Sequence, residues 1–277
     1  MKYYYYCGII SLLLLSPITI FAQNTSASYK NCDNVIHDKL IGAQFRSPTD
    51  CEVKYDLEVK AAFQKSFEKV VSGFQNDHWI VTKMTTLDPV TGVPRAADNS
   101  SYLGDYDIEL QIDPKSEKYT TFRKRNEELA NVGYPPDSAK METFLKYGHQ
   151  MNAAININIH ARVNSTYSSI YIFKGGHKML KAPGAAYVIE SSYVQSSGGG
   201  GIESSIDADF VYIGNWNPPV IRKDKDGGEE IKVPFAIVKS GSNLSVRNIF
   251  IRMECNSELA EQILKGIDFS KLTSLLQ

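Results

Sequence analysis

The chain has 277 residues, of which 30 are basic and 31 acidic, so its formal net charge is −1. A nucleic-acid-binding domain carries a net basic surface, so this balance argues against a nucleic-acid partner. The composition, rich in lysine, asparagine and isoleucine, is typical of a bacterial protein, and the length suits one large core or two small ones.

The N-terminal segment has the three parts of a secretory signal peptide. Lys2 supplies a positive charge, an apolar stretch covers residues 8–20, and the small residue Ala22 suits the position before a cleaved bond. A membrane anchor is the alternative, but the apolar stretch is too short to span ~30 Å of hydrocarbon comfortably. We therefore expect a signal peptide over residues 1–22, export to the periplasm or the extracellular space, and no transmembrane helix after cleavage.

Three cysteines remain after cleavage. Cys32 and Cys51 are the disulfide candidate: they would close a loop and pin an N-terminal arm, residues 23–50, to the first helix. The chain-entropy model assigns a loop of this size about 3 kcal/mol of stabilisation. Cys255 is expected as a packed thiol on a buried strand, although its pairing with either partner stays open because connectivity is not readable from sequence.

The first helix has a clear start. Thr49 and Glu52 have the spacing of a capping box, in which each side chain accepts a backbone N–H. An apolar stripe at helical spacing follows, made of Phe63, Phe67, Val70, Val71 and Phe74. Gly73 is the predicted end of this helix.

The first half of the chain then mixes strands and helices. Residues 78–84 read as a strand, and 88–94 are rich in turn formers. Residues 106–112 alternate between apolar and acidic or amide side chains, which predicts a strand with one wet face. Segment 116–130 favours a helix over a hairpin, and a further helix is expected from Asp137 or Ser138 to Tyr147.

The second half is predicted to be mostly strands. Strands are expected at 155–163, 169–174, 185–194, 208–216, 231–239 and 246–255, followed by a helix at 257–265 and a short turn at 270–276. Strands joined by short turns pair antiparallel, because parallel strands need long crossovers. The predicted fold class is α+β: a single antiparallel β-sheet packed against N- and C-terminal helices, in a single α+β domain over residues 23–277.

The stretch SSGGGGIESS, residues 196–205, raises the question of a phosphate-binding loop. A Walker-type loop needs Lys-Ser or Lys-Thr after its last glycine, whereas Ile202 and Glu203 follow here, and the carboxylate would repel phosphate. A strand, not a helix, is expected next. The glycines are therefore interpreted as a slack hairpin connection, with a mobile flap over a groove as the alternative.

Other catalytic and metal-binding patterns are missing from the sequence. The five histidines have no zinc-ligand spacing, and no nucleophile-elbow motif occurs. The acidic run from Asp105 to Asp113 alternates as a strand face and does not follow the pattern of a calcium loop. No cofactor and no metal are predicted.

Two groups of residues are weighed as a binding surface. Tyr187, Tyr212 and Trp216 accompany two prolines near the end of one strand; the core is the favoured place for these rings, and an exposed patch for a protein or a glycan is the alternative. His160 stands on the polar face of its strand, either as a plain surface residue or as a histidine in a binding cleft.

We hypothesise from these patterns an exported, non-enzymatic binding protein of the cell envelope, with a protein partner, a secreted toxin that it neutralises, or a glycan as its ligand. The alternative is a periplasmic hydrolase with catalytic residues dispersed in sequence, in which His160 or His149 would be the base. A structural surface subunit or adhesin is the third hypothesis, and it would expose strand edges that pair between chains.

Overall fold

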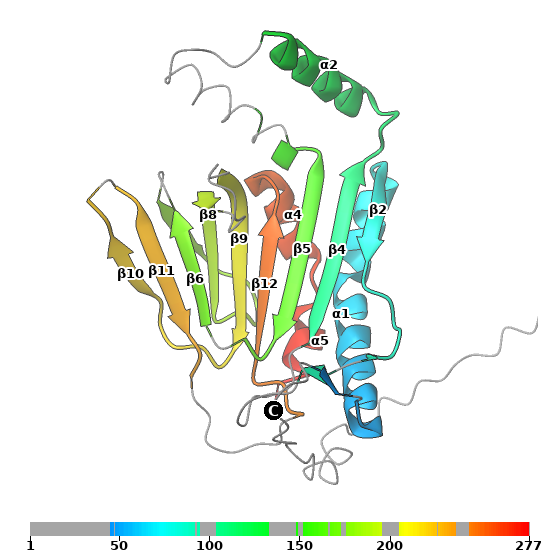
Figure 1. Ribbon diagram of the computed structural model, residues 1–277, viewed down its shortest axis with the longest axis vertical. Helices are drawn as coiled ribbons and strands as arrows, with labels where there is room; N and C mark the ends of the chain where they lie inside the picture. The colour runs from blue at the N-terminus through cyan, green and yellow to red at the C-terminus, as the bar shows by residue number, and fades with distance from the viewer. Residues whose placement is uncertain are drawn as a thin grey trace, which may run out of the picture.

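The computed structural model describes residues 45–46, 48–91, 93–94, 104–132, 148, 152–165, 167–172, 176–195, 205–225, 227–236 and 244–276. Within these ranges the chain forms a ten-stranded antiparallel sheet, a small two-stranded sheet, and helices at both ends of the described sequence. The predicted α+β fold, an antiparallel sheet packed against N- and C-terminal helices, is confirmed (Figure 1).

The elements in chain order are β1 (Phe45–Arg46), α1 (Asp50–Asn76), β2 (Trp79–Met84), β3 (Val93–Pro94), β4 (Asp105–Ile112), α2 (Glu117–Val132), β5 (Asn156–Val163), β6 (Tyr167–Ile172), β7 (His177–Leu180), β8 (Tyr187–Gln195), β9 (Ser205–Gly214), β10 (Val220–Lys223), β11 (Glu229–Pro234), β12 (Asn248–Glu254), α4 (Ser257–Gly266) and α5 (Phe269–Thr273). The large sheet has the order β10-β11-β6-β8-β9-β12-β5-β4-β2, and β7 pairs with β8 outside this path. The last strand, β12, therefore lies in the middle of the sheet, between β9 and β5.

The helix α1 begins as the sequence predicts and ends later. Thr49 is its N-cap, and the capping box with Glu52 is formed in both directions. The prediction that the helix ends at Gly73 is wrong, because α1 continues to Asn76 and has Asp77 as its C-cap. Gly73 is tolerated inside the helix since a glycine costs a helix only about 1 kcal/mol, which the buried face of α1 offsets.

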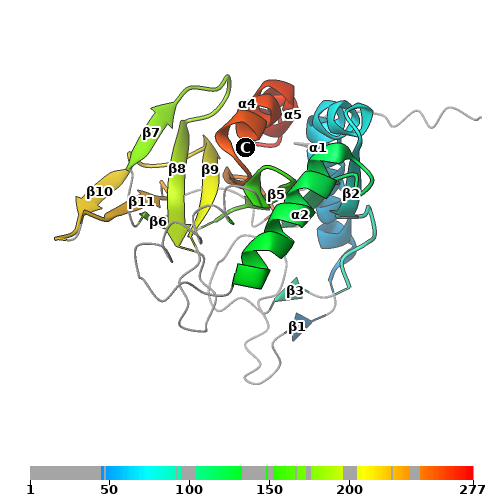
Figure 2. The ribbon, with the colours of Figure 1, turned by 90° about the horizontal axis from the view of Figure 1, so that it is seen from above.

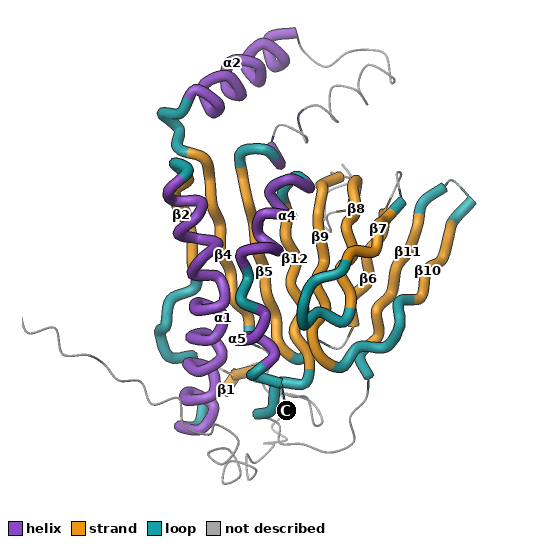
Figure 3. The backbone as a smooth tube through the Cα atoms, turned by 180° about the vertical axis from the view of Figure 1, so that it is seen from behind, coloured by secondary structure: helices purple, strands orange, loops and turns teal. Residues whose placement is uncertain are grey.

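The three helices α1, α4 and α5 cover one face of the sheet, and they cover only part of it. Figures 2 and 3 show them side by side over the half of the sheet that runs from β2 to β9, with β8, β6, β11 and β10 beyond them. Phe63 of α1 stacks on Tyr106 of β4 with 5.5 Å between the ring centroids, and α4 and α5 pack against β9. This side holds the larger hydrophobic core.

A second, smaller core lies on the opposite face of the sheet. Ile170 of β6 and Ile231 of β11 pack with Ile189 of β8 and Phe210 of β9. The pairing of β6 with β8 is limited to Ile172 opposite Val194. This short pairing lets β6 and β11 turn over the face of β8 and β9 and bury it.

Several predicted features are present and several fall outside the described residues. The segment read as helix or hairpin is the helix α2, and the closing helix is α4. The strands β7 and β10 and the pair β1–β3 were not expected, because four residues or fewer are too short to show an alternating pattern. The predicted signal peptide, the helix from 137 to 147 and the four glycines lie outside the described residues, although β8 and β9 on either side of the glycines are antiparallel neighbours.

The cysteines are in different states. Cys51, in the first turn of α1, is disulfide-bonded, whereas Cys255 is a buried free thiol. Cys32 lies outside the described residues, so its pairing with Cys51 stays a prediction. Among the helices that the structure describes, none combines the length and apolarity needed to cross a bilayer.

Replacing two glycines by alanine tests this packing, because the two changes should shift the free energy of unfolding in opposite directions. An alanine at Gly73 would meet no atom within 4 Å, so Gly73→Ala should raise the free energy of unfolding by up to about 1 kcal/mol. Gly214 has φ +89° and its added Cβ would lie 2.7 Å from the Arg247 carbonyl oxygen, so Gly214→Ala should lower it by more than about 1 kcal/mol. Urea titration of both variants measures the two changes; equal effects would contradict the packing described here.

Candidate functional site: two charged regions on opposite faces of the sheet

One cross-strand row shows where the helix layer ends. On the helix side, Lys178 of β7, Glu190 of β8, Asp209 of β9, Met253 of β12 and Ile159 of β5 are successive partners across the sheet. Met253 and Ile159 lie in the core under the helices. From Asp209 of β9 outward the same row is charged, and there it lines the space between β7–β8 and the helices α4 and α5.

These charged residues line a groove of about 1080 Å³ between the β7–β8 region and α4 and α5. Lys178 and Glu190 form one wall and are ion-paired, with 2.8 Å between Nζ and Oε1. Leu264 and Phe269 supply apolar surface on the helix side of the groove. Asp209 lies between these two walls.

Asp209 is the unusual residue of the groove. It is only 4% exposed, yet within the part of the chain that the structure describes no hydrogen bond or ion pair reaches its carboxylate. Burial raises the pKa of Asp209 to about 7, the negative charges of Glu190 and Asp207 add to the rise, and Lys178 opposes it. A carboxyl group in such a state can bind a cation or exchange a proton near neutral pH.

A smaller cavity of about 260 Å³ adjoins the groove along Glu190 and Asp209. His177 lines this cavity, and its Nδ1 lies 2.7 Å from Oε2 of Glu229 on β11. This hydrogen bond lowers the pKa of Glu229; burial acts in the opposite direction. Burial raises the pKa of the Cys255 thiol, so this cysteine is a poor nucleophile despite its place in the cavity wall.

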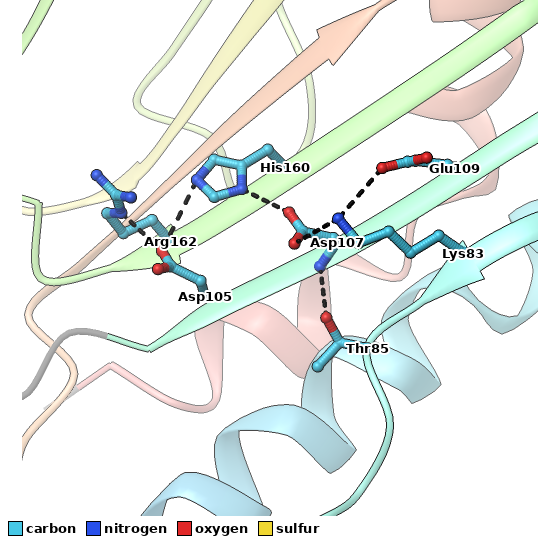
Figure 4. A network of polar contacts seen from close by, with 7 residues as sticks. All are labelled: Lys83, Thr85, Asp105, Asp107, Glu109, His160 and Arg162. Carbon is cyan, nitrogen blue, oxygen red and sulfur yellow. Dashed lines mark hydrogen bonds and ion pairs between the residues drawn. The ribbon is translucent and has the colours of Figure 1, made fainter. Parts of the chain in front are cut away.

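The opposite face of the sheet carries a second group of charges, shown in Figure 4. Nδ1 of His160 lies 2.7 Å from Oδ1 of Asp107, and Nε2 lies 3.7 Å from Oδ1 of Asp105. Arg162 Nε donates to the same Asp105 oxygen at 2.6 Å. Lys83 Nζ lies 3.4 Å from Asp107 and 3.2 Å from Glu109.

We call this region the open polar face; it comprises Lys83, Asp105, Asp107, Glu109, Asn158, His160, Arg162, Arg252 and Glu254. Its described part includes a depression of about 140 Å³. Burial by itself would raise the pKa of Asp107, but the hydrogen bond and charge of His160 and the ammonium of Lys83 outweigh it and lower this pKa. Asp107 is therefore held as a carboxylate, with its backbone N–H donating to Thr85 Oγ1 at 2.8 Å.

The aromatic candidates do not form a binding patch. Tyr212 is fully buried and Trp216 is 7% exposed, both in the second core, and Tyr187 is half-buried against it. Tyr212 donates a hydrogen bond to Ser168 Oγ, and Trp216 donates from Nε1 to the Ile213 carbonyl oxygen. The alternative of an exposed aromatic surface is thus wrong for Tyr212 and Trp216, because β6 and β11 cover them. Only His160 of the four candidates reaches solvent in a charged setting.

No protein-family model, curated protein or solved structure matches the chain. Among the described residues, no three His, Cys, Asp or Glu side chains are grouped so that they could hold a metal ion. His149, the second candidate base, lies outside the described residues.

Asp209, Glu190 and His177 were missed, although a signal for two of them exists in the sequence. Asp209 lies on the same face of β9 as Val211 and Ile213, and Glu190 lies on the same face of β8 as Val188. The valines and the isoleucine belong to the core on the helix side. A carboxylate at a core position of an apolar strand is a functional signal, because burying it is costly. His177 stands in the short strand β7, which carries no such pattern.

Asp209→Asn tests the buried carboxyl. Because the folded pKa of about 7 lies above the ordinary value of 3.8, folding takes up a proton between these values, and the contribution of Asp209 to stability falls as pH rises from about 4 to 7. Asp209→Asn should therefore be more stable than the wild type at pH 8, by up to about 4 kcal/mol, and lose this advantage at pH 4. Urea titrations across this range measure it.

The matched control is Asp113→Asn, since Asp113 accepts a hydrogen bond from the Lys115 amide outside the groove and an asparagine can do the same. This control should follow the wild-type pH dependence. A stability difference between Asp209→Asn and the wild type that does not grow between pH 4 and 7 would contradict the environment described for Asp209.

Proposed function

We propose that the chain is an exported, non-enzymatic binding protein of the cell envelope, and that it recognises a protein partner through the open polar face. The observation that carries the proposal is the mutual pairing of charges on this face. Arg162 with Asp105, Lys83 with Asp107 and Glu109, and Arg252 with Glu254 hold one another in place. Such an array offers fixed donors and acceptors with little rearrangement on binding.

The exposure of these side chains supports recognition of another molecule. Asp105 is 48% exposed and Lys83 is 55% exposed, so both can still bind a partner's polar groups while Asp105 pairs with Arg162 and Lys83 with Asp107. Four carboxylates and three lysine or arginine cations are interspersed over the described part of the face, and His160 lies between them. A mixed-charge surface favours a protein of complementary charge pattern, because electrostatic complementarity sets specificity and association rate.

The shape of the face favours binding over catalysis. The His160–Asp107 pair resembles a base oriented by a carboxylate, but it lies beside a depression too small to enclose a substrate. The signal peptide expected over residues 1–22 supports export. Together these observations favour a recognition surface displayed in the envelope or outside the cell.

The test is affinity capture from an envelope extract of the source organism with the tagged mature chain. The double variant Lys83→Glu/Arg162→Glu makes the face acidic and should weaken capture of the partner at least about tenfold, since like charges then oppose each other. Lys65 and Lys118 are exposed lysines of α1 and α2, so Lys65→Glu/Lys118→Glu is the charge-matched control and should capture the partner normally. Repeated recovery of no specific partner, or equal loss in both variants, would overturn the proposal.

A hydrolase is the second candidate, and the His177–Glu229 pair favours it. His177 of this pair lines the cavity of about 260 Å³, and Ser191 and Ser257 line the same cavity. A histidine oriented by a carboxylate can act as general base toward a serine or a water. The base in this reading is His177, in place of the His160 or His149 expected from the sequence.

If the chain is a hydrolase, it should turn over p-nitrophenyl acetate, and His177→Ala should lose about 10²-fold or more of that rate because the general base is gone. His78→Asn is the control: His78 lies at the end of α1 with φ 65°, which asparagine tolerates, so its rate should stay at the wild-type level. Release of p-nitrophenolate measures all three proteins. A wild-type rate equal to that of free imidazole would remove this candidate.

A further inference from the structure

We propose that the groove between β7–β8 and α4–α5 binds a small alkylammonium ligand, with its ammonium group at Asp209 and its apolar stem against Leu264 and Phe269. This site lies on the helix side of the sheet, opposite the open polar face, and it is independent of the function proposed for that face. The ligand class follows from the charge, the burial and the shape of the groove.

The carboxylates at the floor of the groove favour a cationic ligand. Glu190 and Asp209 are directly opposite each other on β8 and β9, and Asp207 stands two residues away on the same strand face. Lys178 neutralises Glu190 through their ion pair, but no described group pairs with Asp209. An ammonium ion beside Asp209 would supply the missing partner, and a buried carboxylate gains most from such pairing.

The shape of the groove calls for a small molecule with an apolar part. Its volume of about 1080 Å³ is close to that of the largest typical ligand pockets, and the apolar side chains come mainly from the helix wall. Leu264 and Phe269 stand there, with Leu180 on the β7 side. A stem of a few methylene groups between these residues would remove apolar surface from water.

Other charged groups also face the groove, and they define its rim. The lysines come from α1, β7, the loop after it and α4, and the acidic residues come from α4 and the segment before α5: Lys69, Lys178, Lys181, Lys265, Glu258, Glu261 and Asp268. Lys265 is paired with Glu261 at 2.7 Å. His177 and Cys255 face the adjoining cavity. The positive and negative charges of the rim therefore nearly cancel, and the buried carboxyl with which no described group pairs is that of Asp209 at the floor.

Binding should depend on pH through Asp209. The pKa of Asp209 is about 7, whereas an alkylammonium group stays protonated well above that pH. Only the carboxylate form attracts the ligand, so affinity should rise about tenfold per pH unit up to pH 7 and level off above it. Binding at pH 6 should release a proton.

The experiment is calorimetric titration of the full mature chain with n-pentylamine between pH 5.5 and 8.5, with 1-pentanol and pentanoate as neutral and anionic probes of the same length. Saturable binding of the amine, with the pH profile above and at least tenfold weaker binding of both other probes, is expected. Proton release is read from titrations in two buffers of different ionisation enthalpy. Asp209→Asn should lose the binding and the pH profile, and Asp113→Asn should keep both.

Three results would overturn the proposal: no saturable binding of n-pentylamine at pH 8, equal binding of pentanol and pentylamine, or an Asp209→Asn variant that binds the amine as the wild type does. A pH profile that survives in Asp209→Asn would be a fourth such result, because the profile would then belong to another group. Circular dichroism of the variant checks folding, and the wild-type probe series and pH profile decide the question by themselves if the variant is unfolded.

Discussion

The structure depends on how much of each face of the sheet is covered, by helices on one side and by β6 and β11 on the other. The register between the strands determines at which residues this cover ends. On the helix side, the row from Ile159 through Met253 to Asp209 changes from apolar to charged at β9. On the other side, the row from Asp107 through His160 and Arg252 to Phe210 changes in the opposite direction. Each face is therefore partly core and partly polar, and the core on one face lies largely behind the polar part of the other.

This offset gives the two charged regions different characters. On the open polar face, the charges neutralise one another in a network that is exposed to water, so pairing there adds little stability and mainly orders the surface. At the groove, the Asp209 carboxyl is buried near the edge of the helix layer, and no described group pairs with it. A protein that retains such a cost at one position usually gains function by it.

The sequence predicted the features that depend on local pattern. The capping box at Thr49, the alternation from Tyr106 to Ile112 and the closing helix after Asn256 all follow from neighbouring residues, and each is present. Gly73 misled the prediction because a glycine stops an isolated helix more readily than one whose other turns are packed. Tyr212 and Trp216 could be placed only once β6 and β11 were seen to cover them.

By itself, the sequence determined which residues alternate, where helices begin and which side of each strand is wet, since these depend on periods of two and 3.6 residues. The tertiary structure alone decided which strands are neighbours. It placed Glu190 and Asp209 opposite each other on neighbouring strands, and it brought His177 to Glu229 and His160 to Asp107 within hydrogen-bonding distance. It also placed the edge of the helix layer at β9. The reason is physical: the state of a carboxylate or a histidine depends on the groups within a few ångströms, and those groups come from strands far apart in the chain.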